Sequence, residues 1–87
     1  MNKEKKLHDQ ESFFETRDAG EASLLKSLGA KYVGSKIKEN DVWFVFRYKE
    51  KCEETIRGYL NGAFPEVEAF INAQREIKKI IVNLTRK

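Results

Sequence analysis

One seven-residue run, Val42–Tyr48, constrains the fold of this chain more than any other segment. β-Branched or aromatic side chains occupy six of its seven positions, which is typical of a β-strand. Successive side chains of a strand point to opposite faces. One face would carry Val42, Phe44, Phe46 and Tyr48, and the other would carry Trp43, Val45 and Arg47. We expect the first face to lie in the core, so what the second face contacts becomes the main question.

The length and composition predict one small domain. The chain has 87 residues, of which 40% are hydrophobic and 36% are charged, and a chain of this size can bury one core. Residues 1–11 are almost entirely polar, so we expect a flexible charged arm there and a single α+β domain over residues 12–87. Cys52 is the only cysteine, and no apolar run is long enough to span a membrane. A soluble, cytoplasmic protein is therefore expected.

Local signals predict the element order β-α-β-β-α-α. Strands are expected over residues 12–17, 31–38 and 42–48, and helices over residues 19–28, 50–60 and 65–84. Asp18 suits the N-cap of the first helix, and Gly29 suits the left-handed position after its last turn. Pro65 suits the first position of the third helix. The predicted fold class is α+β, with a three-stranded, mainly antiparallel sheet and the helices packed on one face.

The sequence contains no pattern of residues that predicts catalysis or metal binding. His8 is the only histidine, and it lies in the polar arm without the partners that a catalytic or metal-binding role needs. Cys52 falls in the apolar stripe of its helix, where a cysteine behaves as a small hydrophobic side chain. No cluster of metal ligands and no glycine-rich phosphate loop occurs. We therefore expect a protein that is not an enzyme and needs no cofactor or metal.

The second face of the sheet is the best predicted binding surface. Alternation along the three strands would bring aromatic and basic side chains together there, provided that Val33, Ser35 and Ile37 point inward. The candidate binding residues are Phe13, Arg17, Tyr32, Lys36, Lys38, Trp43 and Arg47. Aromatic rings interleaved with cations suit single-stranded nucleic acid, because bases stack on the rings and phosphates pair with the cations.

Two other interpretations of this face remain open. Aromatic residues on a second sheet face are often covered, either by a helix of the same chain or by a second copy in a homodimer. A different protein partner is the other interpretation. The C-terminal helix carries a basic end of its own, since five cations follow Gln74 and Glu76 is the single acid among them. Cations also stabilise a helix C-terminus without any ligand, so this feature alone does not predict a site.

Short motifs are spread over most of the chain. They are F-x-T-x-D at Phe14–Asp18, a helix ending in Gly29, F-x-F at Phe44–Phe46 and Y-x-N-G at Tyr59–Gly62. Over about residues 13–80 they resemble a family of small uncharacterised domains that occur in bacterial genomes, phages and other mobile elements. The chain departs from the family in its longer charged arm and in Ala63–Pro65, where the family's connection is more polar. The resemblance implies the fold and no activity, and a phage origin would favour a small inhibitor or regulator of a host macromolecule.

The sequence thus favours a small non-enzymatic binding module, acting on nucleic acid or on a nucleic-acid-handling complex through the aromatic and basic sheet face. The alternative is an inhibitor that acts by protein interaction, as a counter-defence or regulatory protein that binds a host protein. Such a protein could also form a homodimer. A sensor for a small nucleotide is a third hypothesis. No membrane partner is expected. The exposure of Trp43 is the observation that best separates these hypotheses.

Overall fold

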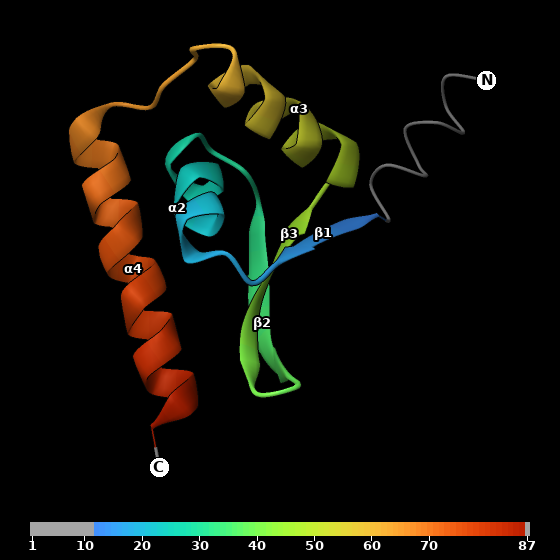
Figure 1. Cartoon of the computed structure of the whole chain (residues 1–87), viewed down its shortest axis with the longest axis vertical. Coiled ribbons are helices and arrows are strands. Elements are labelled where there is room, and N and C mark those ends of the chain that lie inside the picture. The colour runs from blue at the N-terminus through green and yellow to red at the C-terminus, as the bar shows by residue number, and fades with distance from the viewer. Residues whose placement is uncertain (1–11, 87) are drawn as a thin grey trace.

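A computed structural model of the chain describes residues 12–86. Its elements are β1 (Phe13–Thr16), α2 (Ala19–Ser27), β2 (Tyr32–Lys38), β3 (Asp41–Arg47), α3 (Lys49–Leu60) and α4 (Val67–Thr85) (Figure 1). The predicted order β-α-β-β-α-α is confirmed, and every boundary lies within two residues of its expected position. The predicted arm of residues 1–11 lies outside the described residues, as does Lys87.

The three strands form one antiparallel sheet in the order β1-β3-β2. Phe14 of β1 pairs with Phe46 of β3, and Ser35 of β2 pairs with Phe44 of β3. The aromatic run is therefore the central strand, and its backbone is hydrogen-bonded along both edges. This arrangement confirms the predicted α+β fold class with an antiparallel sheet.

A two-residue turn joins β2 to β3. Glu39 and Asn40 both have positive φ, at 55° and 70°, as a type I′ hairpin turn requires. Asn tolerates this left-handed conformation better than most residues do. The tight turn places Lys38 directly opposite Asp41, and this pairing fixes the register of the hairpin.

A β-bulge at the start of β2 changes which side chains face the core. The register passes from the pair Tyr32–Phe46 to the pair Gly34–Val45, so Val33 is the extra residue. Tyr32 therefore lies on the core side, where its ring packs edge to face against that of Phe46 with centroids 5.6 Å apart. The prediction that Tyr32 points outward and Val33 inward is wrong, because strict alternation does not hold across a bulge.

Beyond the bulge, the predicted alternation of β2 holds. Lys36 lies opposite Trp43 on the outer face, and Ile37 lies opposite Val42 on the core side. Ile37 is nevertheless 53% exposed. The reason is that the β2–β3 hairpin extends past the end of α2, so the tip of its inner face has little helical cover (Figure 1).

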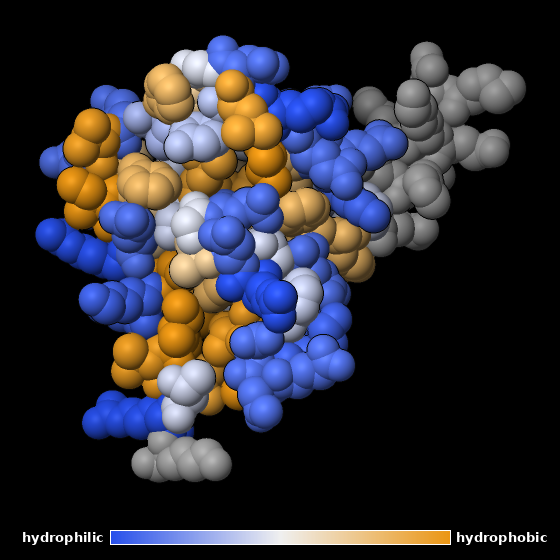
Figure 2. Space-filling view, viewed as in Figure 1, coloured by the Kyte–Doolittle hydropathy of each residue, from blue (hydrophilic) through white to orange (hydrophobic). Residues whose placement is uncertain are grey.

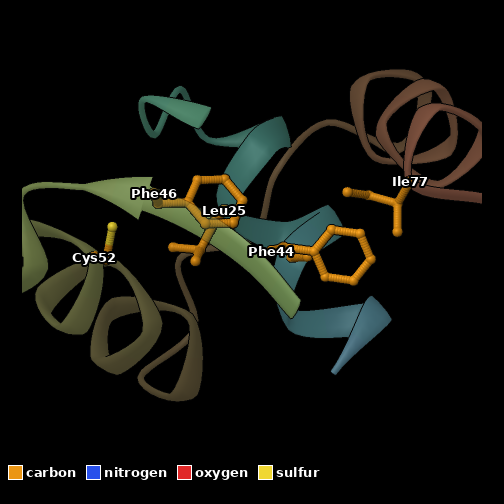
Figure 3. Close-up of a cluster of buried hydrophobic side chains, with 6 residues drawn as sticks. Leu25, Phe44, Phe46, Cys52 and Ile77 are labelled. Atoms are coloured by element: carbon orange, nitrogen blue, oxygen red, sulfur yellow. The ribbon is translucent and has the colours of Figure 1, made fainter. Parts of the chain in front are cut away.

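The hydrophobic core lies between the inner face of the sheet and the helices. Phe44 and Phe46 of β3 are 1% and 0% exposed. They cluster with Leu25 of α2, Cys52 of α3 and Ile77 of α4 (Figure 3). Each helix thus contributes a buried side chain to one core, and all three pack on the same face of the sheet, as predicted.

The ends of the first two helices follow their sequence signals, with one departure. Asp18 caps α2 by accepting a hydrogen bond of 3.0 Å from the backbone N–H of Glu21. Gly29 follows α2 with a φ of 89°. Tyr48 was predicted to continue the core face of the strand, but it has a φ of 66° and is the N-cap of α3. It leaves the alternation because the chain reverses from strand to helix at this single residue.

Helix α4 differs from its prediction in its start and in how much of it is buried. It begins at Val67 after an extended Glu66, whereas the sequence predicted a start at Pro65. The helix packs mainly on α2 and only slightly on the sheet. Ala73 and Ile77 are its buried residues, whereas Val67, Ile71, Val82 and Leu84 are exposed.

Two isoleucines of α4 provide a matched test of this packing. We expect Ile77→Ala to lower the free energy of unfolding by about 2–5 kcal/mol, because it leaves a cavity beside Phe44. Ile71→Ala removes the same atoms from a side chain that is 40% exposed, so we expect a clearly smaller loss. Urea unfolding followed by circular dichroism measures both. Equal losses would contradict the assignment of Ile77 to the core.

Candidate functional site

Six of the seven predicted binding residues share the outer face of the sheet, away from the helices. We call this surface the outer sheet face. Its members are Phe13 and Glu15 from β1, Arg17 just after β1, Lys36 and Lys38 from β2, and Asp41, Trp43, Val45 and Arg47 from β3. Tyr32 is the exception, since the bulge turns it towards the core. The structure therefore brings together the aromatic and basic side chains of the predicted surface, except for the ring of Tyr32.

Most cations of the outer sheet face are paired with carboxylates of the same face. Arg17 Nη1 lies 3.0 Å from Asp41 Oδ2. Lys36 Nζ lies 2.8 Å from Glu15 Oε2, and Lys38 Nζ lies 3.7 Å from Glu15 Oε1. Three of the four predicted phosphate-binding cations are thus already neutralised in part by their neighbours. Exposed ion pairs of this kind are weak, but a ligand phosphate would have to compete with them.

Trp43 is partly buried by these same cations. Lys38 Nζ lies 4.4 Å from the centre of the indole ring, and Arg17 Cζ lies 6.0 Å from it. Cation–π contacts at such distances contribute about 0.5–1 kcal/mol each at exposed sites. The indole Nε1 is buried and has no hydrogen-bond partner within the described part of the chain. Among residues 12–86, the side chains over Trp43 thus belong to the outer sheet face, and the C-terminal helix, which the sequence left open as a cover, joins the core on the other side of the sheet.

Glu15 is the electrostatic centre of the outer sheet face. The hydrogen bond from Lys36 holds the pKa of Glu15 below its usual value, and the positive charges of Lys36 and Lys38 act in the same direction, while burial opposes them. The carboxylate stabilises the fold only while it is ionised, because the protonated form loses the attraction to both lysines. Its contribution is therefore present at neutral pH and is lost as the pH falls through the lowered pKa.

The cations of α4 have a different setting. Arg75, Lys78 and Lys79 are exposed, and no ion pair involving them occurs within residues 12–86. Glu76, the acid in their midst, pairs with Lys26 of α2 at 3.0 Å. Three exposed cations without an ion pair in this part of the chain thus lie close together on α4, whereas three of the four cations of the outer sheet face are paired.

A second surface, which the sequence analysis missed, lies where α3 joins α4. We call it the junction patch, and its exposed members are Tyr59, Leu60, Phe64, Val67 and Ile71. Leu60, Phe64 and Val67 are 74%, 70% and 76% exposed. In Figure 2 apolar side chains gather over this end of the molecule. One sequence signal pointed to it, because Phe64 is a large apolar side chain in the short link between the two helices.

The described residues offer no metal site and no membrane-spanning helix. Within residues 12–86, no group of three or more His, Cys, Asp or Glu side chains is arranged to hold a metal ion. None of the helices in this part of the chain is long and apolar enough to cross a membrane.

Comparison with known proteins identifies the family. Residues 11–83 match the family described as Domain of unknown function (DUF5659). The chain belongs to this family. The match spans the whole sheet, α2, α3 and most of α4, so both the outer sheet face and the junction patch lie within the DUF5659 domain. No curated protein and no solved structure matches the chain.

The pairing of Glu15 predicts a specific pH dependence. In the wild-type protein, the free energy of unfolding should fall between about pH 5 and pH 3 partly because Glu15 becomes protonated. Glu15→Gln removes this ionisation, so we expect its stability to fall less steeply over the same range. Urea unfolding at a series of pH values measures the difference.

The matched control for this test is Glu54→Gln on α3. Glu54 is exposed and has no ion pair within residues 12–86, so this variant should keep the wild-type slope. A wild-type slope in Glu15→Gln would show that the lysine contacts do not persist in solution.

Proposed function

We propose that this domain is a non-enzymatic protein-interaction module that docks a partner protein through the junction patch. The observation that carries the proposal is the exposure of Leu60, Phe64 and Val67, each of which leaves at least 70% of its surface open. Single exposed apolar residues are common, but a contiguous apolar patch marks an interaction site. Burial of such residues by a partner stabilises a complex by about 25 cal/mol per Å² of apolar surface removed from water, before the costs of association.

The patch has the form of a docking site. The rings of Tyr59 and Phe64 pack edge to face with centroids 5.3 Å apart, which holds both side chains in place before a partner arrives. Beside them, a cleft of about 210 Å³ is lined by Tyr59, Pro65, Val67, Phe70 and Ile71. Packed aromatic side chains beside a cleft are typical of interfaces in which a few residues provide most of the binding energy.

A regulatory or inhibitory role fits a small domain of this kind, because such a protein acts by binding its partner and needs no catalytic site. The resemblance to domains of phages and mobile elements points to a host protein as the partner and to counter-defence as one setting. In another version of the same proposal the patch joins two copies in a homodimer. Size-exclusion chromatography at several protein concentrations separates these versions.

Loss of the patch should abolish capture of the partner. We expect the double variant Leu60→Ser, Phe64→Ser to recover a bacterial partner protein at least about tenfold less well than the wild type from nuclease-treated lysate, because the apolar contact area is lost. Quantitative mass spectrometry of the captured proteins measures recovery. Circular dichroism should show an intact fold, since both side chains are exposed.

The matched control is Val33→Ser, Ile37→Ser. These two side chains are 50% and 53% exposed on β2, outside the junction patch, so their loss should leave capture unchanged. Equal loss in both double variants, or none in either, would refute the role of the patch.

The outer sheet face supports a second candidate function, binding of single-stranded nucleic acid. The observation in its favour is the position of Trp43 between Lys38 and Arg17, with Arg47 placed over the ring of Phe13 at 5.9 Å. Rings next to cations are what stacked bases and phosphates require. The internal ion pairs weigh against this function, and for that reason we rank it second.

The ion pairs also make the second candidate testable. If the face binds nucleic acid, Glu15→Gln should strengthen retention of a single-stranded DNA oligonucleotide, because Lys36 and Lys38 lose the negative charge with which they pair. Trp43→Ala should weaken retention, and rising salt should weaken it in every variant. Fluorescence anisotropy with a labelled oligonucleotide measures all three. Absence of binding to the wild-type protein at low salt would remove this function from consideration.

A further inference from the structure

We infer that the groove between α2 and α4 binds an acidic amphipathic helix of the partner protein. The inference rests on the proposed function and deepens it, because the groove adjoins the junction patch at Ile71, which lines both the groove and the cleft of the patch. It adds the chemistry of the partner, which the patch alone does not specify.

The groove has the shape and floor that a helix requires. Its volume is about 430 Å³. Ile71, Ile77 and Ile81 of α4 line it, and on the opposite wall Ala19 and Gly20 of α2 leave room because their side chains are small or absent. An added helix lying here would bury its apolar side against both α2 and α4, which is the helix-in-groove mode of recognition.

The exposed side of α4 extends this surface over most of the helix. Val67, Ile71, Gln74, Lys78 and Val82 follow one another at intervals of three or four residues. Residues so spaced share one face of a helix. The three apolar members are 76%, 40% and 48% exposed. Helix α4 has 19 residues, and at 1.5 Å per residue its contact length is about 28 Å.

The charge of this face selects an acidic partner. Arg75 and Lys78 line the groove, and together with Lys79 they also line the neighbouring depression that contains Val82. No carboxylate of residues 12–86 forms an ion pair with any of the three. A carboxylate of the partner can therefore pair with them without breaking an existing contact, and such complementarity raises both specificity and association rate.

Two other occupants fit this surface less well. A nucleic acid would meet the cations, but it has no apolar face to place on Ile71, Ile77 and Ile81. A second copy of the chain would bring its own α4, and Arg75 lies near the middle of that helix. A symmetric pairing of two α4 helices about their midpoint, Glu76, would set Lys78 of each copy opposite Gln74 of the other and next to its Arg75, and like charges in contact oppose association.

A selection experiment tests the inference with the folded protein. The probe is a displayed library of peptides of about 18 residues, or five helical turns. Apolar residues are fixed at helical spacing, and the flanking positions are drawn from Glu, Lys, Gln and Ser. We expect recovered peptides to be enriched in Glu over Lys at the flanking positions by at least about tenfold, an energy of about 1.4 kcal/mol. Chemical-shift changes at the methyl groups of Ile71, Ile77 and Ile81 should mark the groove as the site.

Charge reversal provides the decisive comparison. The variant Arg75→Glu, Lys78→Glu should reverse the selection and recover Lys-rich peptides. The control Lys49→Glu, Lys51→Glu makes the same change in charge on exposed residues of α3, and its selection should stay Glu-rich. A selection that shows no preference for Glu, or that does not reverse in the α4 variant, overturns the inference. Self-association of the wild-type chain that is lost in Ile71→Glu would overturn it in favour of a second copy.

The two levels of the proposal fail in different ways. Loss of lysate capture in Leu60→Ser, Phe64→Ser together with a selection that lacks acidic preference would leave the docking patch standing and remove only the acidic helix. If the library instead yields Glu-rich peptides but Leu60→Ser, Phe64→Ser captures as much partner as the wild type, the acidic helix stands and the docking patch is refuted.

Discussion

The packing of Phe44 and Phe46 beneath the three helices is the interaction on which the rest of the structure depends. Both rings come from the central strand, and α2, α3 and α4 reach this one cluster through Leu25, Cys52 and Ile77. Within residues 12–86 all three helices contribute to the core on this one side of the sheet. The contacts to Trp43 on the other side therefore come, in this part of the chain, from Lys38 and Arg17.

The outer sheet face makes these contacts through charged side chains. The charged ends of Lys38 and Arg17 lie over the indole ring of Trp43 and interact with its π system. Glu15 and Asp41 then hold these cations and Lys36 in place. The arrangement resembles a nucleic-acid surface in composition, yet much of its charge is used within the molecule. Composition alone therefore overstates how much of this face is available to an anionic ligand.

Helix α4 is in the opposite situation. It is anchored through Ala73 and Ile77. Because it packs mainly on α2, one of its flanks keeps exposed apolar residues and cations that form no ion pair within residues 12–86. The junction patch continues this surface around the end of α3. An apolar surface of this extent is a liability for a domain that remains alone and an advantage for one that docks. For this reason we propose α4 and the α3–α4 junction as the binding surface, and rank the outer sheet face second.

Much of the fold could be predicted because its signals are local. The alternation of Val42–Arg47 identified the central strand, Asp18 and Gly29 marked the ends of α2, and the element order followed from these segments. The same alternation correctly placed six of the seven candidate residues on one face. The prediction for Tyr32 is wrong because one extra residue in β2 reverses the alternation. Gly34, an isolated glycine within the strand, is a sequence mark of such a bulge that strict alternation ignores.

What the sequence by itself determined is therefore the set of elements, the side chains of the core strand and the composition of each face. The tertiary structure alone decided which charges are paired, since Glu15 and Lys36 are 21 residues apart and Arg17 and Asp41 are 24 apart. It also decided that α4 docks along α2 and leaves the junction patch and the groove open. The physical reason is that alternation and capping depend on neighbouring residues, whereas ion pairing and burial depend on the packing of segments that are distant in the chain.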